Sequence, residues 1–199
     1  EIFGASKAFV AISNGSTVTW GHHLFGGDSS SVQACLQNTK VQRLVATCGA
    51  VAALLEDGQV VTWGNARQGG DSSAVQDQLR NVTDLAASAA AFAAIADGCL
   101  VTWGHPDFGG ESDLALHPDR LGSTQLGSLC ASAAAFGAVR ADGSLITWGH
   151  PRFGGRTDVL CHRNSVTQLL APMHNCAVGF AALLSDGSVT TWGNNHEVK

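Results

Sequence analysis

The sequence is poor in charged residues and has no long apolar run, and these two shortages exclude classes of function. Only 14% of its 199 residues are charged, and the formal net charge is −5. Phosphate backbones are bound mainly by surplus lysine and arginine, so we expect no direct nucleic-acid partner. Gly, Ser, Asp or His interrupts every apolar run well before the roughly 18 to 20 residues of a membrane span. We therefore expect no membrane span either.

Paired cysteines of the metal-binding kind are also missing. None of the six cysteines forms a C-x-x-C pair, and none has the Cys/His spacing of a zinc site, so we expect no metal and no cofactor. The preferred interpretation is free, buried thiols that pack as small apolar side chains. The alternative is two local disulfides, Cys35–Cys48 and Cys161–Cys176, in an oxidising compartment. No signal-peptide pattern is visible from Glu1 onward, so the sequence leaves the compartment open.

The sequence does contain a repeat, marked by Trp-Gly pairs at intervals of 40 to 45 residues. The pairs are Trp20-Gly21, Trp63-Gly64, Trp103-Gly104, Trp148-Gly149 and Trp192-Gly193. A period near 40 is typical of propeller blades, whereas a leucine-rich solenoid would have a shorter period and a Leu/Asn ladder. We therefore expect one repeat domain over residues 1–199, in which the tryptophans are structural. Trp63, Trp103 and Trp148 in particular are predicted to be buried between blades.

A glycine five residues before each tryptophan marks a hairpin turn. These glycines are Gly15, Gly58, Gly98, Gly143 and Gly187, and each follows an Asn or an Asp. Asn-Gly and Asp-Gly favour the two-residue type I′ turn. We predict five two-residue hairpins with positive φ at each glycine. The repeated Asp side chains are therefore assigned to turn chemistry and not to catalysis.

A third apolar segment precedes each hairpin, as in 41–46, 82–86 and 166–171, so each blade has at least three strands. Small residues crowd the join between this segment and the hairpin, as backbones converging around a propeller axis require. The predicted fold is all-β, a β-propeller or an arc of one, with five short and mainly three-stranded blades. The blades are expected at about 1–21, 41–64, 82–104, 124–149 and 167–193.

Loops on the rim hold the candidate binding residues. A Gly-Gly pair six residues after each of the first four tryptophans predicts a sharp turn. The spacings Ser30…Gln33 and Ser73…Gln76 then predict capping boxes and short helical turns. The residues two after each tryptophan are His22, Asn65, His105, His150 and Asn194. We interpret them as side chains that bond their own turns; the alternative is a rim cluster for a ligand or metal.

Phenylalanines precede three of the Gly-Gly turns, at Phe25, Phe108 and Phe153. They either pack between blades or form a partner-facing apolar stripe together with the neighbouring histidines. No P-loop and no nucleophile elbow is present. We therefore predict no catalytic and no cofactor-binding residue, and expect that the chain is not an enzyme.

The motif A-F-x-A-x-x-x-D-G-x-x-x-T-W-G, best kept in Ala8 to Gly21 and Ala135 to Gly149, resembles the repeats of the regulator of chromosome condensation superfamily. The short period is more similar to a compact branch that includes a secreted β-lactamase inhibitor protein; similar runs occur in large HECT-type ubiquitin ligases. The resemblance implies the fold only, because the family's functional loops lie outside the motif. After Trp-Gly, the usual asparagine and Gly-Gln-Leu-Gly are replaced here by His or Asn and by Gly-Gly-Asp.

Three functions are compatible with these features. The leading hypothesis is a non-catalytic protein–protein interaction scaffold, such as an accessory subunit, whose partner is another protein or a multisubunit complex. The first alternative is the regulatory or substrate-recruiting propeller of an enzyme, either a guanine-nucleotide exchange factor or a ubiquitin ligase. The second is a secreted inhibitor or glycan-binding module. Five blades imply a small closed ring or an arc; we expect an arc, whose uncovered sheet faces other blades or a partner would cover.

Overall fold

A computed structural model of the chain describes residues 1–13, 15–116, 125–156, 165–171 and 178–193. They form five antiparallel sheets of three strands, each built from three strands consecutive in the chain. The strands are β1 (Ile2–Gly4), β2 (Ala8–Ser13), β3 (Ser16–Gly21), β4 (Val41–Ala46), β5 (Ala50–Leu55), β6 (Val60–Gly64), β7 (Val82–Ala87), β8 (Ala91–Ala96), β9 (Cys99–Gly104), β10 (Leu126–Ala131), β11 (Ala135–Arg140), β12 (Leu145–Gly149), β13 (Val166–Leu170), β14 (Gly179–Leu184) and β15 (Val189–Gly193). The predicted blade of three short strands is confirmed.

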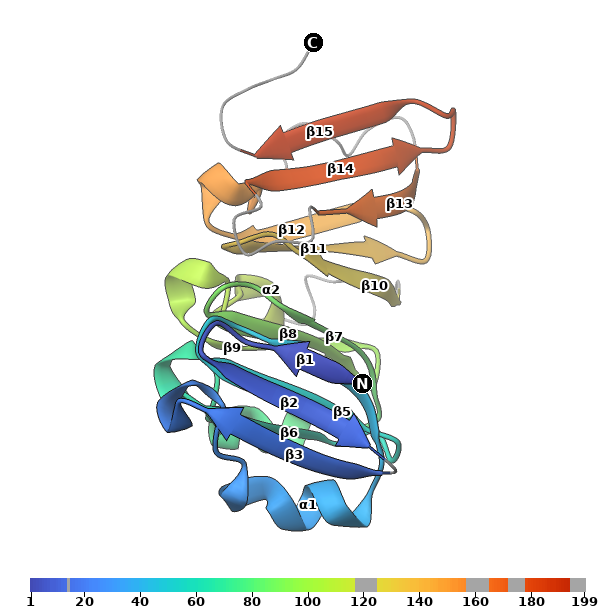
Figure 1. Cartoon of the computed structure of the whole chain (residues 1–199). Helices are drawn as coiled ribbons and strands as arrows, with labels where there is room; N and C mark the ends of the chain where they lie inside the picture. Colours follow the sequence, from blue (N-terminus) through green and yellow to red (C-terminus); the bar gives the residue numbers. More distant parts are fainter. Residues whose placement is uncertain (14, 117–124, 157–164, 172–177, 194–199) are drawn as a thin grey trace.

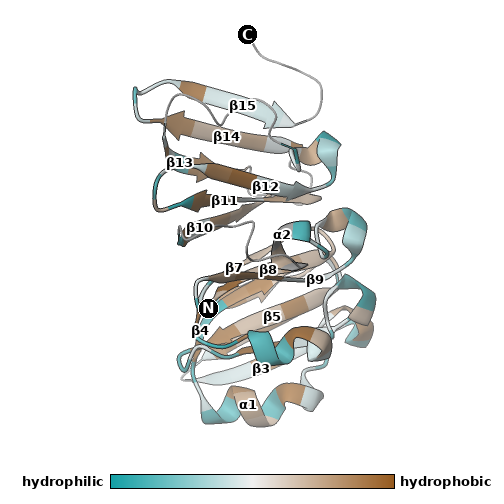
Figure 2. Cartoon of the chain, turned by 180° about the vertical axis from the view of Figure 1, so that it is seen from behind, coloured by the Kyte–Doolittle hydropathy of each residue, from teal (hydrophilic) through white to brown (hydrophobic). Residues whose placement is uncertain are grey.

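The sheets are stacked in chain order as an open arc. Figure 1 and Figure 2 show the first sheet (β1–β3) and the last (β13–β15) at opposite ends of the molecule. Apolar clusters join each sheet to the next, as in the cluster of Val10, Leu44, Val51 and Trp63 between the first two. The expected arc is therefore what the chain forms, and each internal sheet is covered on both faces.

Each tryptophan lies opposite an apolar residue of the strand beside it. Phe92 pairs with Trp103 across β8 and β9, and their stacked ring centroids are 5.3 Å apart. The same stack recurs in the first, fourth and fifth sheets, where the centroids are 5.4 to 5.5 Å apart. Trp63, Trp103 and Trp148 are buried, as predicted. Each buried aromatic ring removes a large apolar area from water, so the stacked pairs help to hold neighbouring sheets together.

The hairpins are of two kinds, and the prediction of five two-residue loops is wrong for three of them. Ala96 pairs directly with Cys99, and Asp97 and Gly98 have φ of 49° and 77°, which is a two-residue type I′ turn. Ser13 and Ser16 pair in the same way in the first sheet. The other three hairpins have three-residue loops, which are Glu56-Asp57-Gly58, Ala141-Asp142-Gly143 and Ser185-Asp186-Gly187.

One extra residue explains this difference. Ala50 and Ala91 both pair with the glycine that follows the tryptophan, yet the second hairpin is one residue longer than the third. The extra residue produces a turn in which Gly58 N donates to Leu55 O, and Leu55 N donates to Gln59 O. Glycine has positive φ in all five hairpins, as predicted. In the longer loops the Asp side chain accepts from the backbone two residues ahead, as Asp57 Oδ1 does from Gln59 N at 3.0 Å.

Small residues fill the joins between first and second strands, as expected for backbones that converge. Cys48 N donates to Ala89 O at 2.8 Å, and Ala89 N donates to Ala133 O at 2.9 Å, so backbone hydrogen bonds run from sheet to sheet. Ser6 Oγ continues this series by donating to Cys48 O. The joins therefore tie four consecutive sheets together.

Short 3₁₀ turns follow the sheets on the rim, and the Gly-Gly pairs end them. They are η1 (His23–Phe25), η3 (Ala66–Gln68), η5 (Pro106–Phe108) and η7 (Pro151–Phe153), each followed by a glycine with φ between 87° and 97°. The further helical pieces are η2 (Ser30–Val32), α1 (Gln33–Asn38), η4 (Ser73–Gln78) and α2 (Asp113–Leu116). Helical turns on the rim were predicted, and they are present.

The serines that bond the two glutamines differ from those predicted. Gln33 accepts from Ser29 and Gln76 accepts from Ser72, one residue before the serines of the expected capping boxes. Asp71 Oδ1 instead accepts from Ser73 N at 2.9 Å, one residue before the N-cap position Ser72. A carboxylate directly after Gly-Gly thus competes successfully for the free N–H groups of the turn.

Cys35, Cys99 and Cys130 are free thiols, and because Cys35 is free the alternative of a Cys35–Cys48 disulfide is wrong. Cys35 and Cys99 are exposed, which also contradicts the interpretation that all thiols are buried. Burial raises the pKa of the Cys130 thiol. Cys161 and Cys176 lie outside the described residues. No helix in the described ranges is long and apolar enough to cross a membrane.

Candidate interaction surface

The open end of the first sheet presents a row of exposed apolar side chains, which we call the leading face. It consists of Ile2, Phe9, Val18 and Trp20, which are 71%, 47%, 58% and 43% exposed. The equivalent residues of the second sheet are Leu44, Val51, Val61 and Trp63, and they are 7%, 2%, 9% and 2% exposed. The two sets differ only because the first sheet buries the second set. The leading face is therefore a blade interface without its neighbour.

The last sheet has a complementary exposed surface, which we call the trailing face. Leu170, Leu183 and Val189 are 54%, 37% and 68% exposed. In the second sheet Leu54 and Val60 stand at the positions of Leu183 and Val189, and they are 2% and 0% exposed. Most of the large exposed apolar side chains of the described residues thus lie on the two ends of the arc. Contiguous apolar surface of this kind marks a binding site more often than scattered exposed residues do.

The rim histidines bond their own turns. His22 Nδ1 accepts from Leu24 N at 3.3 Å, and His105 and His150 make the same bond to Asp107 N and Arg152 N. Asn65 Oδ1 does the same with Arg67 N. Equivalent positions stand on separate blades, and within the described residues no three His, Cys, Asp or Glu side chains gather as metal ligands. Asn194 lies outside the described residues.

The predicted phenylalanines are half-buried beside these histidines. The rings of Phe25, Phe108 and Phe153 each meet the histidine three residues earlier edge to face, with centroids 4.9 to 5.3 Å apart. Phe108 also packs on the core between the third and fourth sheets. Lys7 Nζ lies 4.4 Å from the centroid of Phe25. A partner-facing role for these six rim residues remains a prediction.

Three hydroxyl groups hold the rim turns against the sheets, although the sequence pattern groups them with the small residues of the joins. Thr47, Ser88 and Ser132 donate to the carbonyl oxygens of Gln68, Phe108 and Phe153 at 3.1, 2.9 and 2.8 Å. The first sheet has Ala5 at this position, which has no hydroxyl group to donate. The turn that contains Phe25 therefore lacks an anchor that the next three turns possess.

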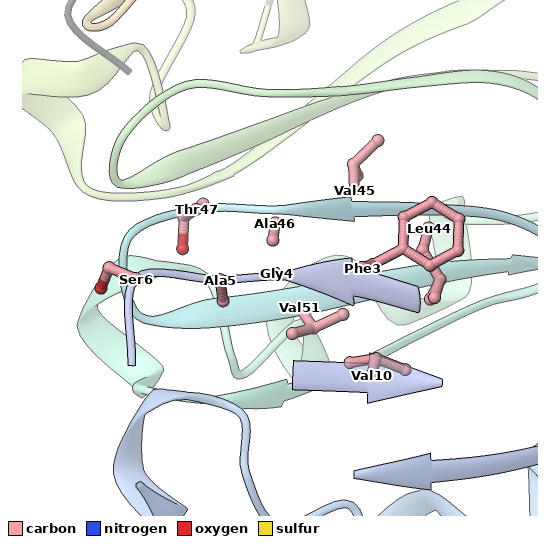
Figure 3. A pocket seen from close by; sticks show the side chains of 10 residues that line it. All are labelled: Phe3, Gly4, Ala5, Ser6, Val10, Leu44, Val45, Ala46, Thr47 and Val51. Atoms are coloured by element: carbon pink, nitrogen blue, oxygen red, sulfur yellow. The ribbon is translucent and has the colours of Figure 1, made fainter. Parts of the chain in front are cut away.

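A crevice of about 390 Å³ lies between the first two sheets. Figure 3 shows Phe3 and Leu44 at one end of it and Ser6 and Thr47 at the other. Its lining has no ionisable side chain, and the small residues Gly4, Ala5 and Ala46 lie in the middle. The crevice therefore offers apolar contacts and two hydroxyl groups, with no group suited to acid–base chemistry.

An ionic bridge joins the first strands of three internal sheets. Asp84 on β7 accepts from Arg43 on β4 and, at 2.7 Å, from the backbone N of Leu129 on β10. Leu85 N also donates to it at 2.9 Å. Asp84 stands beside a break in the β7–β8 register, which turns its carboxylate toward the neighbouring sheets. Its partners are one side chain and two backbone N–H groups of the sheets, so we interpret Asp84 as a residue that stabilises the packing of neighbouring blades.

The repeat pattern does not single out Ile2, Phe9 or Val18, and it places Trp20 among the structural residues. Because the pattern treats all five copies alike, it cannot show which copy lacks a neighbour. The available signal is position in the array: in an open arc of these five copies, no other described sheet covers the Trp face of the first copy.

No protein-family model matches the chain, and no curated protein sequence matches it. Solved structures do resemble it. The human protein WBSCR16 has a TM-score of 0.64 at 15% identity, over 97% of this chain and 62% of that one. Yeast RCC1 (Prp20), solved with Kap60 bound, has a TM-score of 0.63 at 18% identity, over 97% and 55%. The ectodomain of the Physcomitrella patens receptor kinase CR4 gives 0.61 at 14%, over 100% and 51%.

The chain thus spans from about half to less than two-thirds of the length of these three chains. At such low identity the likeness shows the fold and nothing more specific. Together with the five three-stranded sheets, it establishes that the chain is an open five-bladed β-propeller that resembles propellers of the RCC1 type.

Proposed function

We propose that this chain is a protein–protein interaction scaffold that binds its partner through the ends of the arc. The observation that carries the proposal is the leading face, where four apolar side chains stand exposed although their counterparts in the next sheet are buried. Trp and Phe are the residue types that most often anchor protein interfaces. Strand edges and sheet faces left open in this way are normally covered in the assembled state.

Similar folds support this role. Yeast RCC1 is known as a complex with Kap60, and Prp20p from Saccharomyces cerevisiae has been characterised for its binding to Gsp1p and histones. Those partners belong to those proteins. For this chain we propose an accessory subunit of a larger assembly, within the compact short-repeat branch that its period resembles. The low charged fraction favours a protein partner over nucleic acid.

A second candidate is the regulatory propeller of an enzyme. The specific observation that favours it is the likeness to the ectodomain of a receptor kinase, a propeller that is part of a protein with an enzyme domain. In that case the ends of the arc would contact the enzyme that the propeller regulates. The same surface would serve both candidates, so one experiment addresses them together.

The test places a photo-activated cross-linking residue at position 18 of the leading face, and in a separate protein at position 78. Gln78 is exposed on η4, away from both end faces, and serves as the control position. The tagged proteins are expressed in the cells that normally make the chain. We expect one defined protein to cross-link from position 18 and not from position 78.

Matched charge variants complete the test. Val18→Glu puts a carboxylate into the leading face, whereas Gln78→Glu adds the same charge elsewhere. We expect Val18→Glu to lose co-purification of the cross-linked protein and Gln78→Glu to retain it, with the same circular dichroism spectrum for both. Absence of any cross-link from position 18, or equal recovery with both variants, would refute the proposal.

A further inference from the structure

Each covered tryptophan packs against the Gly-Gly turn that follows the preceding blade and donates a hydrogen bond to it. We call this turn, together with the sheet face beside it, the receiver. The indole Nε1 atoms of Trp63, Trp103, Trp148 and Trp192 donate to the carbonyl oxygens of Gly26, Gly69, Gly109 and Gly154 at 2.9, 3.0, 3.2 and 3.2 Å. In every case the acceptor is the first glycine of the pair, directly after the 3₁₀ turn. This hydrogen bond is thus a constant part of the blade interface.

The acceptor must be glycine for steric reasons as well as conformational ones. A Cβ atom on Gly69 would stand 2.5 Å from the Phe92 ring, and one on Gly109 would stand 2.7 Å from the Phe136 ring. Both glycines also have positive φ, of 92° and 87°. The surface that receives a blade therefore has two parts: an aliphatic sheet face and a Gly-Gly turn that lies flat on the aromatic pair.

The leading face has a stacked Phe–Trp pair of the same kind, but no Gly-Gly turn of the described residues packs against it. Phe9 and Trp20 are stacked with centroids 5.5 Å apart and an interplanar angle of 15°, as Phe136 and Trp148 are at 5.4 Å and 15°. Trp20 Nε1 donates to no acceptor among the described residues. The pair is therefore already arranged for a Gly-Gly turn, and its donor is available.

A second copy of the same 199 residues supplies only half of this receiver. Its trailing face offers Leu170, Leu183 and Val189. The sequence after Trp192 is Gly193-Asn194-Asn195-His196-Glu197-Val198-Lys199, which contains no Gly-Gly pair. Head-to-tail association of two copies would cover the apolar side chains but would not supply the turn that receives Trp20.

We propose that the leading face binds one further blade of the same repeat type, whose rim turn ends in Gly-Gly, and that a second copy of these residues is not that partner. The new blade supplies an aliphatic sheet face for Ile2, Phe9 and Val18 and a glycine carbonyl for Trp20 Nε1. The inference rests on the proposed function and specifies the chemistry of the partner. The Trp–Gly hydrogen bond of this interface already occurs four times within the chain, and three of those interfaces also have the stacked Phe–Trp pair.

The test adds such a blade to the intact chain. Residues 125–168, which include the Gly154-Gly155 turn, are joined directly before Ile2 of the full chain. This junction keeps the repeat in register, because Leu169 pairs with Ala182 as Ile2 pairs with Ala11. The matched control carries Gly154→Leu in the added segment only, which puts a large side chain where the Phe9 ring must lie.

Hydrogen exchange of the Trp20 indole N–H, assigned by its loss in Trp20→Phe, is the measurement. We expect exchange about tenfold slower or more in the fusion than in the parent chain, because a buried hydrogen-bonded N–H exchanges only on local opening. The Gly154→Leu fusion should exchange as fast as the parent chain. The indoles of Trp63 and Trp103, which stay protected in a folded chain, report that all proteins are intact.

Three outcomes would overturn the inference. The first is fast Trp20 exchange in the fusion while Trp63 and Trp103 stay protected. The second is equal protection by the two fusions, which would mean that any apolar cover suffices. The third is protection that grows with the concentration of the parent chain, which would identify a second copy as the occupant. None of them bears on cross-linking from position 18, so this inference and the proposed function can fail separately.

Discussion

Trp63 donates from Nε1 to the carbonyl oxygen of Gly26 at 2.9 Å, and this bond fastens the second sheet to the turn that leaves the first. The turn ends at Gly26, whose positive φ of 97° is a conformation that glycine adopts without steric cost. Each sheet is thus fixed to its predecessor by a side chain and by the loop between them. Stability in such an array is built from each blade and its contacts with nearest neighbours.

Truncation of an internal tryptophan should therefore weaken two blades at once. We expect Trp103→Ala to reduce the free energy of unfolding by about 3 to 5 kcal/mol, because it leaves a large cavity in a buried interface. Trp103→Phe keeps most of the apolar volume but leaves the buried Gly69 carbonyl without its donor. It should cost about 1 to 3 kcal/mol. Urea unfolding followed by circular dichroism measures both losses.

Trp20→Ala is the matched control. Trp20 also pairs with a phenylalanine, Phe9, on the neighbouring strand, but no described blade covers it. Its loss of stability should be clearly smaller than that of Trp103→Ala. Equal losses for the two variants would mean that Trp20 is covered in the isolated chain, which would contradict an exposed leading face.

The sequence predicts the repeat, the strands and the positive φ of the turn glycines, because each depends on a local pattern. The length of the hairpin loops could not be predicted from the motif alone. The constant distance from glycine to tryptophan hid an extra residue on the other side of the turn, at Glu56, Ala141 and Ser185. Counting backward to Ala50 and Ala91 would have revealed it. The need for positive φ explains the glycine in every turn. The number of residues before that glycine decides whether the loop has two or three residues.

Gly98→Val tests the backbone of the shorter loop. Gly98 has a φ of 77°, and a Cβ atom there would meet nothing within 4 Å, so any cost comes from the backbone and not from a clash. We expect a loss of about 1 kcal/mol or more, since β-branched residues are poorly tolerated at positive φ. Gly98→Asn should cost less, because asparagine enters this region more readily. The two melting temperatures, measured side by side, decide the point; identical values would contradict it.

The candidate site was less predictable than the fold. The motif identifies Trp20 as one of five equivalent residues, and its distinct environment follows only from the absence of a covering sheet. The exposed fractions of Phe9 and Val51, at 47% and 2%, differ because of their place in the array. A periodic sequence describes an interface that repeats, and it does not distinguish one copy of that interface from another.

Asp71 should titrate below the ordinary value of 3.8. The backbone N–H of Ser73, and secondly its hydroxyl group, hold the pKa of this carboxyl down by bonding its charged form. Because the folded pKa is lowered, the stabilisation is complete above 3.8 and is lost as the pH falls through the folded value. Ser73→Ala should raise the pKa of Asp71 part of the way back, since the backbone bond remains. NMR titration of the carboxyl carbon measures it; an unchanged pKa in the variant would assign the whole effect to the backbone.

The cysteines should differ in reactivity. Cys35 and Cys99 are exposed free thiols, whereas burial raises the pKa of Cys130. Thiolate is the reactive form, so at pH 8 we expect Cys130 to be alkylated on the order of tenfold more slowly than Cys35. Peptide mass spectrometry after timed labelling gives the rate at each residue. A Cys35 that reacts only after reduction would show that it is held in a disulfide.

Thr17→Val should stabilise the chain. The Thr17 side chain is buried between the first two sheets, and its Oγ1 has no hydrogen-bond partner among the described residues. The equivalent positions of the internal sheets carry Val60, Leu100 and Leu145, so an aliphatic residue suits this place. Valine keeps the β-branched shape that favours a strand and removes a buried group that costs about 1 to 3 kcal/mol when unsatisfied.

Thr62→Val is the matched control for that experiment. Thr62 lies on the equivalent strand of the second sheet and its hydroxyl is satisfied, with Ser72 Oγ at 2.9 Å and Gly70 O at 3.3 Å. Its replacement should destabilise the chain by about 1 kcal/mol, because two partners lose their bond. We expect the two Thr→Val variants to move the urea midpoint in opposite directions. If Thr17→Val lowers the midpoint as much as Thr62→Val does, the Thr17 hydroxyl has a partner in solution, and the apolar character of this interface position is refuted.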